Sequence, residues 1–192
     1  MKKVKKRLDK KVSLSYFVQK QNKAQIWIET LIYTLIALIM IGAVLAFVKP
    51  KIQELQDKAI IEQSIELMEY INTKILSTTQ TEGNKRVDKF IIKKGSLKID
   101  GIEDKIVFEM ESRYEYSEPG IEIREGNIIG NTEKKGKLSM VTLILDYKGL
   151  YDITYQEEDK IKTINKASTP YEISILNKGK SNNVTIIEIE IN

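Results

Sequence analysis

The sequence predicts an α+β protein in which one long N-terminal helix, part transmembrane and part amphipathic, precedes an antiparallel β-sheet domain. Three observations predict this fold. An uninterrupted apolar segment occupies residues 26–48, a helical pattern without glycine follows over residues 51–76, and from residue 87 apolar residues recur at every second position. Apolar spacing of three to four residues is typical of helices, and spacing of two is typical of strands. We expect the sheets to form a β-sandwich.

Positive charge is concentrated at the start of the chain. Residues 1–24 hold nine Lys or Arg and one Asp, a net charge of +8, whereas the whole chain carries +4 and residues 25–192 therefore carry −4. A nucleic-acid-binding domain presents its basic residues on a folded surface, so we expect no nucleic-acid partner. The chain has no cysteine and no histidine, which excludes disulfides, thiolate zinc sites and Cys or His nucleophiles.

The apolar segment 26–48 is long enough to cross a membrane. Its 23 residues contain one charge, Glu29, and at about 1.5 Å per residue they span a hydrocarbon core of roughly 30 Å. Because the basic cluster precedes the segment, the positive-inside rule places residues 1–24 in the cytoplasm and the residues after Lys49 outside. A secretory signal peptide fits less well, since its hydrophobic part has about 7 to 15 residues. A buried helix of a soluble domain is the other alternative.

The helical pattern continues beyond the span. Pro50 removes one helical hydrogen bond, so we expect a kink near residue 50 and a helix that continues to about residue 80. Higher in this helix, seven apolar residues form one face within an arc of about 160°. These residues are Ile60, Ile61, Ile65, Leu67, Met68, Ile71 and Ile75. We expect this face to pack against the chain's own β-rich domain.

The apolar face changes sides along the helix. Ile52, Leu55 and Ala59 project on the side that Glu62, Glu66 and Glu69 occupy further along. A membrane anchor with a simple stalk needs no second apolar face. We therefore expect residues 25–80 to form a membrane and assembly helix that packs against copies of itself.

Turn residues and short alternating segments fill the rest of the chain. A loop is expected at 77–86, and residues 85–192 are expected to form an extracytoplasmic β-rich head domain. Nine strands are predicted, at 87–94, 96–100, 104–110, 113–117, 121–125, 138–147, 150–155, 171–177 and 184–191. In the last strand the better core face contains Thr185, Ile187, Ile189 and Ile191.

No residue pattern indicates catalysis or cofactor binding. The acidic residues at 156–160 lack the spaced ligands of a calcium loop, and the glycines form no phosphate-binding pattern. We therefore expect a non-enzymatic protein with no metal, no cofactor and no small-molecule substrate. Asn183, in the triplet Asn-Val-Thr, is a candidate glycosylation acceptor. Gly42 and Ala46 form a small-xxx-small pair of the kind that lets membrane helices approach closely.

The start of the apolar segment carries a more specific pattern. A basic leader ends at Ala24, the letters "QIWIE" run from Gln25 to Glu29, and the uninterrupted apolar helix follows. This arrangement resembles the class III signal peptide of archaeal type IV prepilins and archaellins. In that family a membrane prepilin peptidase cleaves at the cytoplasmic edge of the helix, after a small residue and often before a glutamine. The resemblance covers about residues 20–80 and implies a cut between Ala24 and Gln25.

The resemblance also implies a role for Glu29, which matches the family glutamate four residues after the new N-terminus. Cleavage removes eight net positive charges and creates a free amine on Gln25. In a filament, Glu29 of one subunit can pair with the amine of a neighbour. The alternative is that Glu29 lies at the cytoplasmic headgroup level, paired with Lys23 or solvated. Two features depart from the family: the leader has 24 residues, and alanine replaces the more usual glycine before the cut.

These observations lead to one expected function and one alternative. The expected function is a pilin-like cell-surface structural subunit, anchored in the cell membrane with its N-terminus cytoplasmic and assembled into a filament. Its expected partners are membrane lipid, a prepilin peptidase, and copies of itself or other pilin-like subunits. The alternative is a single-pass membrane protein that never polymerises and uses its external β-domain as an adhesin or complex subunit.

Overall fold

Residues 2–192 form one long helix followed by ten strands. The computed structural model describes the backbone of residues 2–192 and the side chains of residues 25–192, and the chain divides into two units, Met1–Pro50 and Lys51–Asn192. Helix α1 (Lys2–Thr78) contributes to both units and contains Pro50 at the boundary between them. The predicted kink near residue 50 stays a prediction. We call Lys51–Asn192 the head unit.

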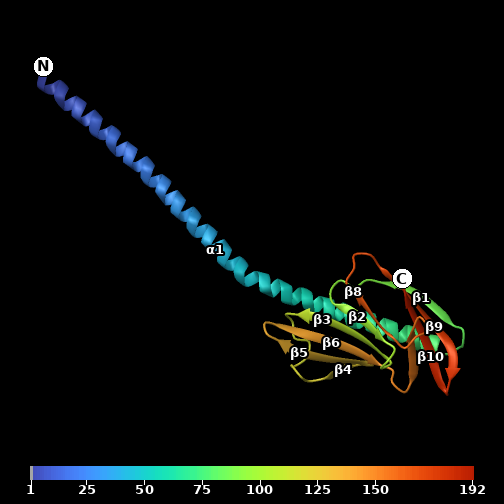
Figure 1. Ribbon diagram of the computed structural model, residues 1–192. Helices are drawn as coiled ribbons and strands as arrows, with labels where there is room; N and C mark the ends of the chain where they lie inside the picture. The colour runs from blue at the N-terminus through green and yellow to red at the C-terminus, as the bar shows by residue number, and fades with distance from the viewer. Residues whose placement is uncertain (1) are drawn as a thin grey trace. The chain divides into compact units, whose positions relative to one another are not determined.

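Two sheets lie beside the last part of α1 in the head unit (Figure 1). The four-stranded sheet has the order β1-β9-β10-β7 and the six-stranded sheet has the order β4-β5-β6-β3-β2-β8. The strands are β1 (Lys85–Phe90), β2 (Ser96–Asp100), β3 (Lys105–Ser112), β4 (Ile123–Glu125), β5 (Ile128–Lys135), β6 (Leu138–Asp146), β7 (Tyr151–Tyr155), β8 (Ile161–Asn165), β9 (Tyr171–Ser181) and β10 (Val184–Ile191). The predicted α+β class is confirmed.

The apolar face of α1 that the sequence predicts is the one that the head buries. Ile61, Met68, Ile71 and Ile75 are almost fully buried, whereas the glutamates on the opposite side are exposed. One apolar core contains residues from this helix face and from both sheets. The core of the head is therefore a three-part contact between the helix and two sheets, and not a sheet-on-sheet contact alone.

Eight of the nine predicted strands occur, and the strand predicted at 113–117 is wrong. Residues 113–117 form a loop, because Tyr116 packs over Gly130 so closely that a Cβ atom there would collide with the ring. Ser117 N also donates to the Thr132 hydroxyl at 3.0 Å. Two strands, β5 and β8, escaped the prediction. The pairing of β7 with β10 is parallel, in contrast to the other strand pairs of the two sheets.

The predicted core face of the last strand is confirmed. Ile187 and Ile189 are fully buried and Ile191 is nearly so. Glu188 points to the other side of β10 and is also buried, where Lys178 Nζ lies 3.1 Å from its carboxylate. A buried carboxylate needs such a partner, because desolvation without one is costly.

A buried carboxylate fixes the place at which α1 enters the head. Asp57 is 6% exposed and lies on the core side of the helix. Its Oδ2 atom accepts a hydrogen bond from Arg113 N at 2.8 Å, and its Oδ1 atom accepts one from Lys94 Nζ. These two donors belong to connections that follow β3 and β1. The aspartate thus ties the helix to two loops of the head.

A second buried polar side chain holds the end of α1. Asn177 of β9 is 3% exposed, and its Nδ2 atom donates to Thr78 O at 3.1 Å and to Thr81 O at 3.2 Å. Its Oδ1 atom accepts from Gly179 N at 2.8 Å. The last carbonyls of a helix have no partner inside the helix, so this side chain acts as a C-terminal cap supplied by a distant strand.

Replacing Asn177 by Ala should destabilise the head by about 1–3 kcal/mol, because buried carbonyl oxygens lose their donor. Asn177→Asp should be worse, since a carboxylate would face the carbonyls of Thr78 and Thr81. Urea unfolding of the full chain in detergent, followed by circular dichroism, measures both. Asn165→Ala, on the exposed side of β8, is the matched control and should change stability by less than about 0.5 kcal/mol. Equal stability of the Asn177→Ala variant and the parent would contradict the cap.

Candidate assembly surface

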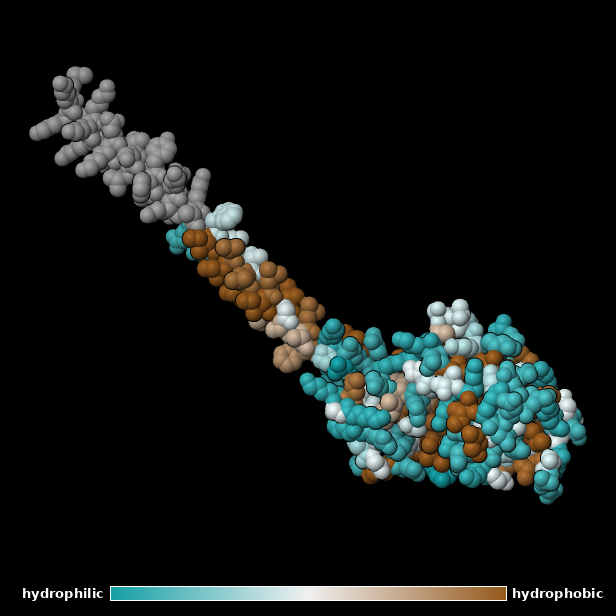
Figure 2. Space-filling view, in the orientation of Figure 1, coloured by the Kyte–Doolittle hydropathy of each residue, from teal (hydrophilic) through white to brown (hydrophobic). Residues whose placement is uncertain are grey.

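The apolar part of α1 before Pro50 is bare in the isolated chain. Every large apolar side chain in residues 26–48 is exposed, from 42% for Val48 to 79% for Phe47. In Figure 2 this stretch is a continuous hydrophobic surface. The helix is long and apolar enough to cross a membrane, and an N-terminal signal sequence has the same character. Lipid or other helices must cover such a surface, because soluble monomers rarely expose patches of this size.

The two threonine hydroxyls of this stretch are partnered within the helix. Thr30 Oγ1 donates to Ile26 O at 2.9 Å, and Thr34 Oγ1 donates to Thr30 O at 2.7 Å. Such bonds to the preceding turn let hydroxyls enter a membrane at little cost. Glu29 is exposed, and it takes part in none of the ion pairs formed among side chains 25–192. The carboxylate is the one charged group of residues 26–48, so an apolar environment would require a partner for it.

Gly42 and Ala46 lie one helical turn apart on the same side of α1. A Cβ atom added at Gly42 would meet nothing within 4 Å. Glycine in a helix interior costs about 1 kcal/mol relative to alanine, so the chain by itself has no use for it here. Close approach of a second helix, as small-xxx-small pairs allow, would give the small residue a purpose, and the packing role of Gly42 and Ala46 stays a prediction.

A second apolar stripe lies on the part of α1 that belongs to the head unit. Ile52 and Leu55 are 47% and 66% exposed, and Ala59 is exposed as well. All three point away from the side on which Asp57 and Ile61 are buried. The predicted change of apolar face is thus present in the structure. The head does not bury the lower stripe, which is the face formed by Ile52, Leu55 and Ala59.

The structure does not test two of the predicted sites, the processing site and the glycosylation acceptor Asn183. The side chain of Ala24, at the predicted processing site, lies outside those that the structure describes, and Gln25 is the first residue whose side chain is described. Asn183 is exposed at the tip of the β9–β10 hairpin. Asn182 and Asn183 both have positive φ, 49° and 70°, which a two-residue hairpin turn requires and which asparagine tolerates. The turn alone accounts for the residue type, and glycosylation of Asn183 stays a prediction.

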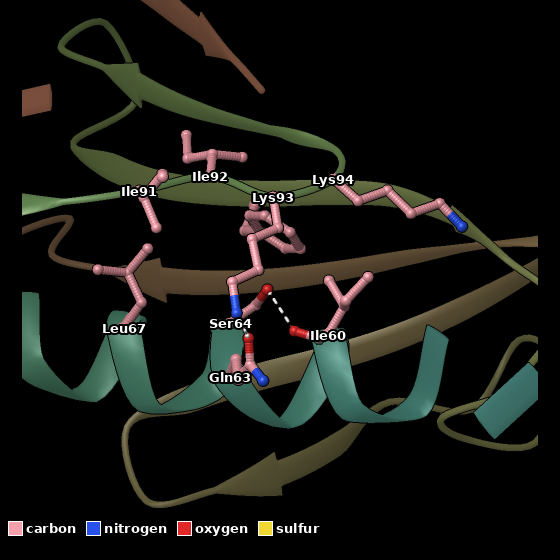
Figure 3. A pocket seen from close by; sticks show the side chains of 9 residues that line it. Ile60, Gln63, Ser64, Leu67, Ile91, Ile92, Lys93 and Lys94 are labelled. Atoms are coloured by element: carbon pink, nitrogen blue, oxygen red, sulfur yellow. Dashed lines mark hydrogen bonds between the residues drawn. The ribbon is translucent and has the colours of Figure 1, made fainter. Parts of the chain in front are cut away.

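Two small hollows indent the head. The first, about 30 Å³, lies between α1 and residues 91–94, where Lys93 Nζ donates to Gln63 Oε1 at 2.9 Å (Figure 3). It has room for about two waters. The second, about 200 Å³, lies between β8 and the adjoining ends of β9 and β10. Both are smaller than the roughly 300 Å³ at which small-molecule sites begin. Within residues 25–192, His, Cys, Asp and Glu side chains form no group of three placed to hold a metal ion.

Comparison with protein-family models, with curated proteins and with solved structures gave no match. The layout itself, a long apolar N-terminal helix followed by antiparallel β-sheets, is consistent with a type IV pilin-like fold.

The two faces of α1 should respond oppositely to truncation. Ile61→Ala removes buried methyl groups and should destabilise the head by about 2–5 kcal/mol. The matched change Ile52→Ala, on the exposed stripe, should change stability by less than about 0.5 kcal/mol. Urea unfolding of the full chain in detergent measures both. A large loss of stability in Ile52→Ala would mean that the head itself uses the lower stripe.

Proposed function

We propose that this chain is a pilin-like cell-surface structural subunit that assembles through its N-terminal helix. The observation that supports this most is the second apolar stripe, Ile52, Leu55 and Ala59, which faces away from the head's own core. Lipid accounts for the bare surface of residues 26–48, but it gives no reason for an apolar stripe beyond the span. Neighbouring helices of the same kind account for both surfaces, because they bundle along their whole length.

Processing precedes assembly in this proposal. A prepilin peptidase in the membrane removes residues 1–24 by cleavage between Ala24 and Gln25, and the apolar helix stays on the mature protein. The leader carries a net charge of +8, which would be hard to bring into a bundle of apolar helices. Its removal leaves one cation, the Gln25 amine, at the head of the helix. The protein then acts as a structural subunit without cofactor.

Glu29 sets the register between subunits. At an effective dielectric near 20, a carboxylate and an amine about 4 Å apart attract by roughly 4 kcal/mol. This is comparable to the cost of about 2.5–3.5 kcal/mol for placing a carboxylate at membrane depth. The pair forms only when the amine of a neighbour lies level with Glu29, so other axial positions leave the carboxylate uncompensated. Gly42 and Ala46 allow the close helix approach on which this alignment depends.

The mature protein should begin at Gln25 in the membrane of the cell that produces it. Mass spectrometry of the membrane-extracted chain identifies the N-terminus. Ala24→Leu should retain the leader, because the resemblance implies a small residue before the cut, whereas Ala43→Leu, inside the span, should be processed normally. If the parent chain still begins at Met1 in cells that contain a matching peptidase, the proposal is wrong. That result would favour the single-pass protein that does not polymerise.

Glu29→Ala should reduce assembly while membrane insertion stays normal. Loss of the register pair should lower the yield of surface filaments by at least about tenfold, the equivalent of 1.4 kcal/mol. Filaments sheared from cells and the amount of chain in the membrane fraction give the two readouts. Glu122→Ala, an exposed carboxylate of the head, is the control and should leave both unchanged. Equal filament yields from the Glu29→Ala variant and the parent would count against the register role.

A further inference from the structure

The head has two distinguishable ends. At the entry end, Arg113 N donates to Asp57 of α1 at 2.8 Å. At the far end, Tyr147 OH donates to Asn72 Oδ1 at 3.1 Å. Strand β6 runs between these points, because Ser139 pairs with Ser112 and Asp146 pairs with Lys105 of β3. The turns of the six-stranded sheet therefore gather at one end or the other along the direction of α1.

The β5–β6 hairpin forms a basic tip at the entry end. Lys135 pairs with Leu138, so Gly136 and Lys137 form the turn, and Gly136 has φ of 67°. At about 3.3 Å per residue the tip extends roughly 7 Å beyond Ser139, which lies level with the entry point of α1. Lys135 and Lys137 are exposed.

Ion pairs near the tip leave two lysines free. Lys134 pairs with Glu115 at 2.8 Å. Among side chains 25–192, no carboxylate forms an ion pair with Lys135 or Lys137. Glu133 on the same hairpin is exposed and is also outside the ion pairs. The tip is therefore a small, protruding cation pair with one anion behind it.

Three carboxylates gather at the far end. Asp104 of the β2–β3 turn accepts a hydrogen bond from Ile153 N at 2.9 Å, which places it beside Asp152. Asp159 lies against Gly101 of the same turn, since its Cα would be 3.3 Å from a Cβ added there. Burial first, and then the charges of Asp159 and Asp104, raise the pKa of Asp152.

The cations of the far end do not neutralise this cluster. Lys148 pairs with Glu103 at 3.1 Å and Lys160 pairs with Glu158 at 2.9 Å. Among side chains 25–192, Lys105, which follows Asp104 in the chain, forms no ion pair with the three carboxylates. The structure thus holds like charges close together without compensation from the described side chains. Ile102 and Leu150, on the turns of the same end, are exposed and add apolar contact area.

We infer that the lysine tip of one head docks on the carboxylate cluster of the next head, so that Lys135 and Lys137 of one copy face Asp104, Asp152 and Asp159 of another. This inference rests on the proposed function, because subunits that repeat along one filament present their heads in the same orientation relative to the filament axis. Neighbours displaced along the helices then meet far end to entry end. Such a contact joins two different surfaces of one molecule and repeats without closing, as a filament requires.

The contact fixes position more than it holds subunits together. Exposed ion pairs contribute little affinity by themselves, whereas like charges brought face to face are strongly unfavourable. The apolar helices supply the attraction, and the head contact selects one axial displacement. An anionic lipid surface is the competing occupant of the lysine tip. It fits less well, because residues 25–192 carry a net charge of −4 and the carboxylate end would stay unexplained.

A charge swap tests the contact in assembled filaments. Lys135→Glu with Lys137→Glu should lower the filament yield by at least about tenfold, since five carboxylates then face one another. Adding Asp152→Lys and Asp159→Lys to the same chain should restore most of the yield. Arg86→Glu with Lys166→Glu, two exposed cations that belong neither to the lysine tip nor to the carboxylate cluster, is the matched control and should assemble like the parent. Parental yield from the first variant, or no rescue by the swap, would overturn the inference.

Crosslinking gives a second readout that does not need filaments. The chain has no cysteine, so Lys137→Cys with Asp159→Cys introduces one cysteine at each end of the head. Mild oxidation in the membrane should give a ladder of disulfide-linked multimers, and Lys137→Cys with Lys166→Cys should give none. A dye attached to Lys137→Cys, in nanodiscs that each hold one chain, reports contact of the tip with anionic lipid. A dye response there, together with the absence of a disulfide ladder in membranes, would overturn the inference in favour of lipid.

The two proposals can fail separately. If processing occurs and filaments form but the charge-swap and crosslinking results are negative, the head contact is wrong and the proposed function stands. If the N-terminus stays at Met1 and no filament forms, the proposed function is wrong, and a missing ladder then removes the head contact as well.

Discussion

Helix α1 carries more apolar surface than its own head can cover, and the rest of the architecture follows from this. The head buries one face from Ile61 to Ile75 and leaves residues 26–48 and the lower stripe bare. Exposure of so large an apolar surface to water is unfavourable in free energy, so lipid or other protein has to cover it. The β-sheets therefore form only the upper part of the apolar contact, and the lower part is left for molecules outside the chain.

Polar groups within this apolar surface define the axial position of α1 in the head. Apolar contacts alone define that position poorly. Isoleucine and methionine recur every three to four residues on the buried face, so a slide of α1 by one turn would exchange similar side chains. Asp57 and Asn177 remove that freedom, because each has hydrogen-bond partners in only one axial position. Buried polar residues are known to fix register in coiled coils in the same way. The head thus has one defined place on the helix.

The sequence predicted those features that depend on local periodicity. Both faces of α1 and eight strands follow from apolar spacing, because burial on one side selects that spacing directly. Strands β5 and β8 lack a regular alternation and exist through pairing with distant strands. The tyrosines of residues 113–117 alternate as in a strand, yet they belong to a loop in which Tyr116 packs over Gly130. The cap at Asn177 joins residues 99 positions apart, which no local pattern can show. Asp57 did leave a signal, as a charge on the apolar arc of the helix.

The same reasoning applies to Glu29 at the other end of α1. Asp57 is a carboxylate on an apolar face, and its hydrogen-bond partners lie within the chain. Glu29 is also a carboxylate on an apolar surface, but it forms no ion pair with the described side chains. In the first case a mismatch in axial position would leave a buried charge without donors. In the second the same penalty would act between molecules, once lipid or neighbouring helices cover the segment. In the assembly that we propose, apolar surface supplies the attraction in both contacts, and a single carboxylate in each selects the one alignment in which that attraction is not opposed.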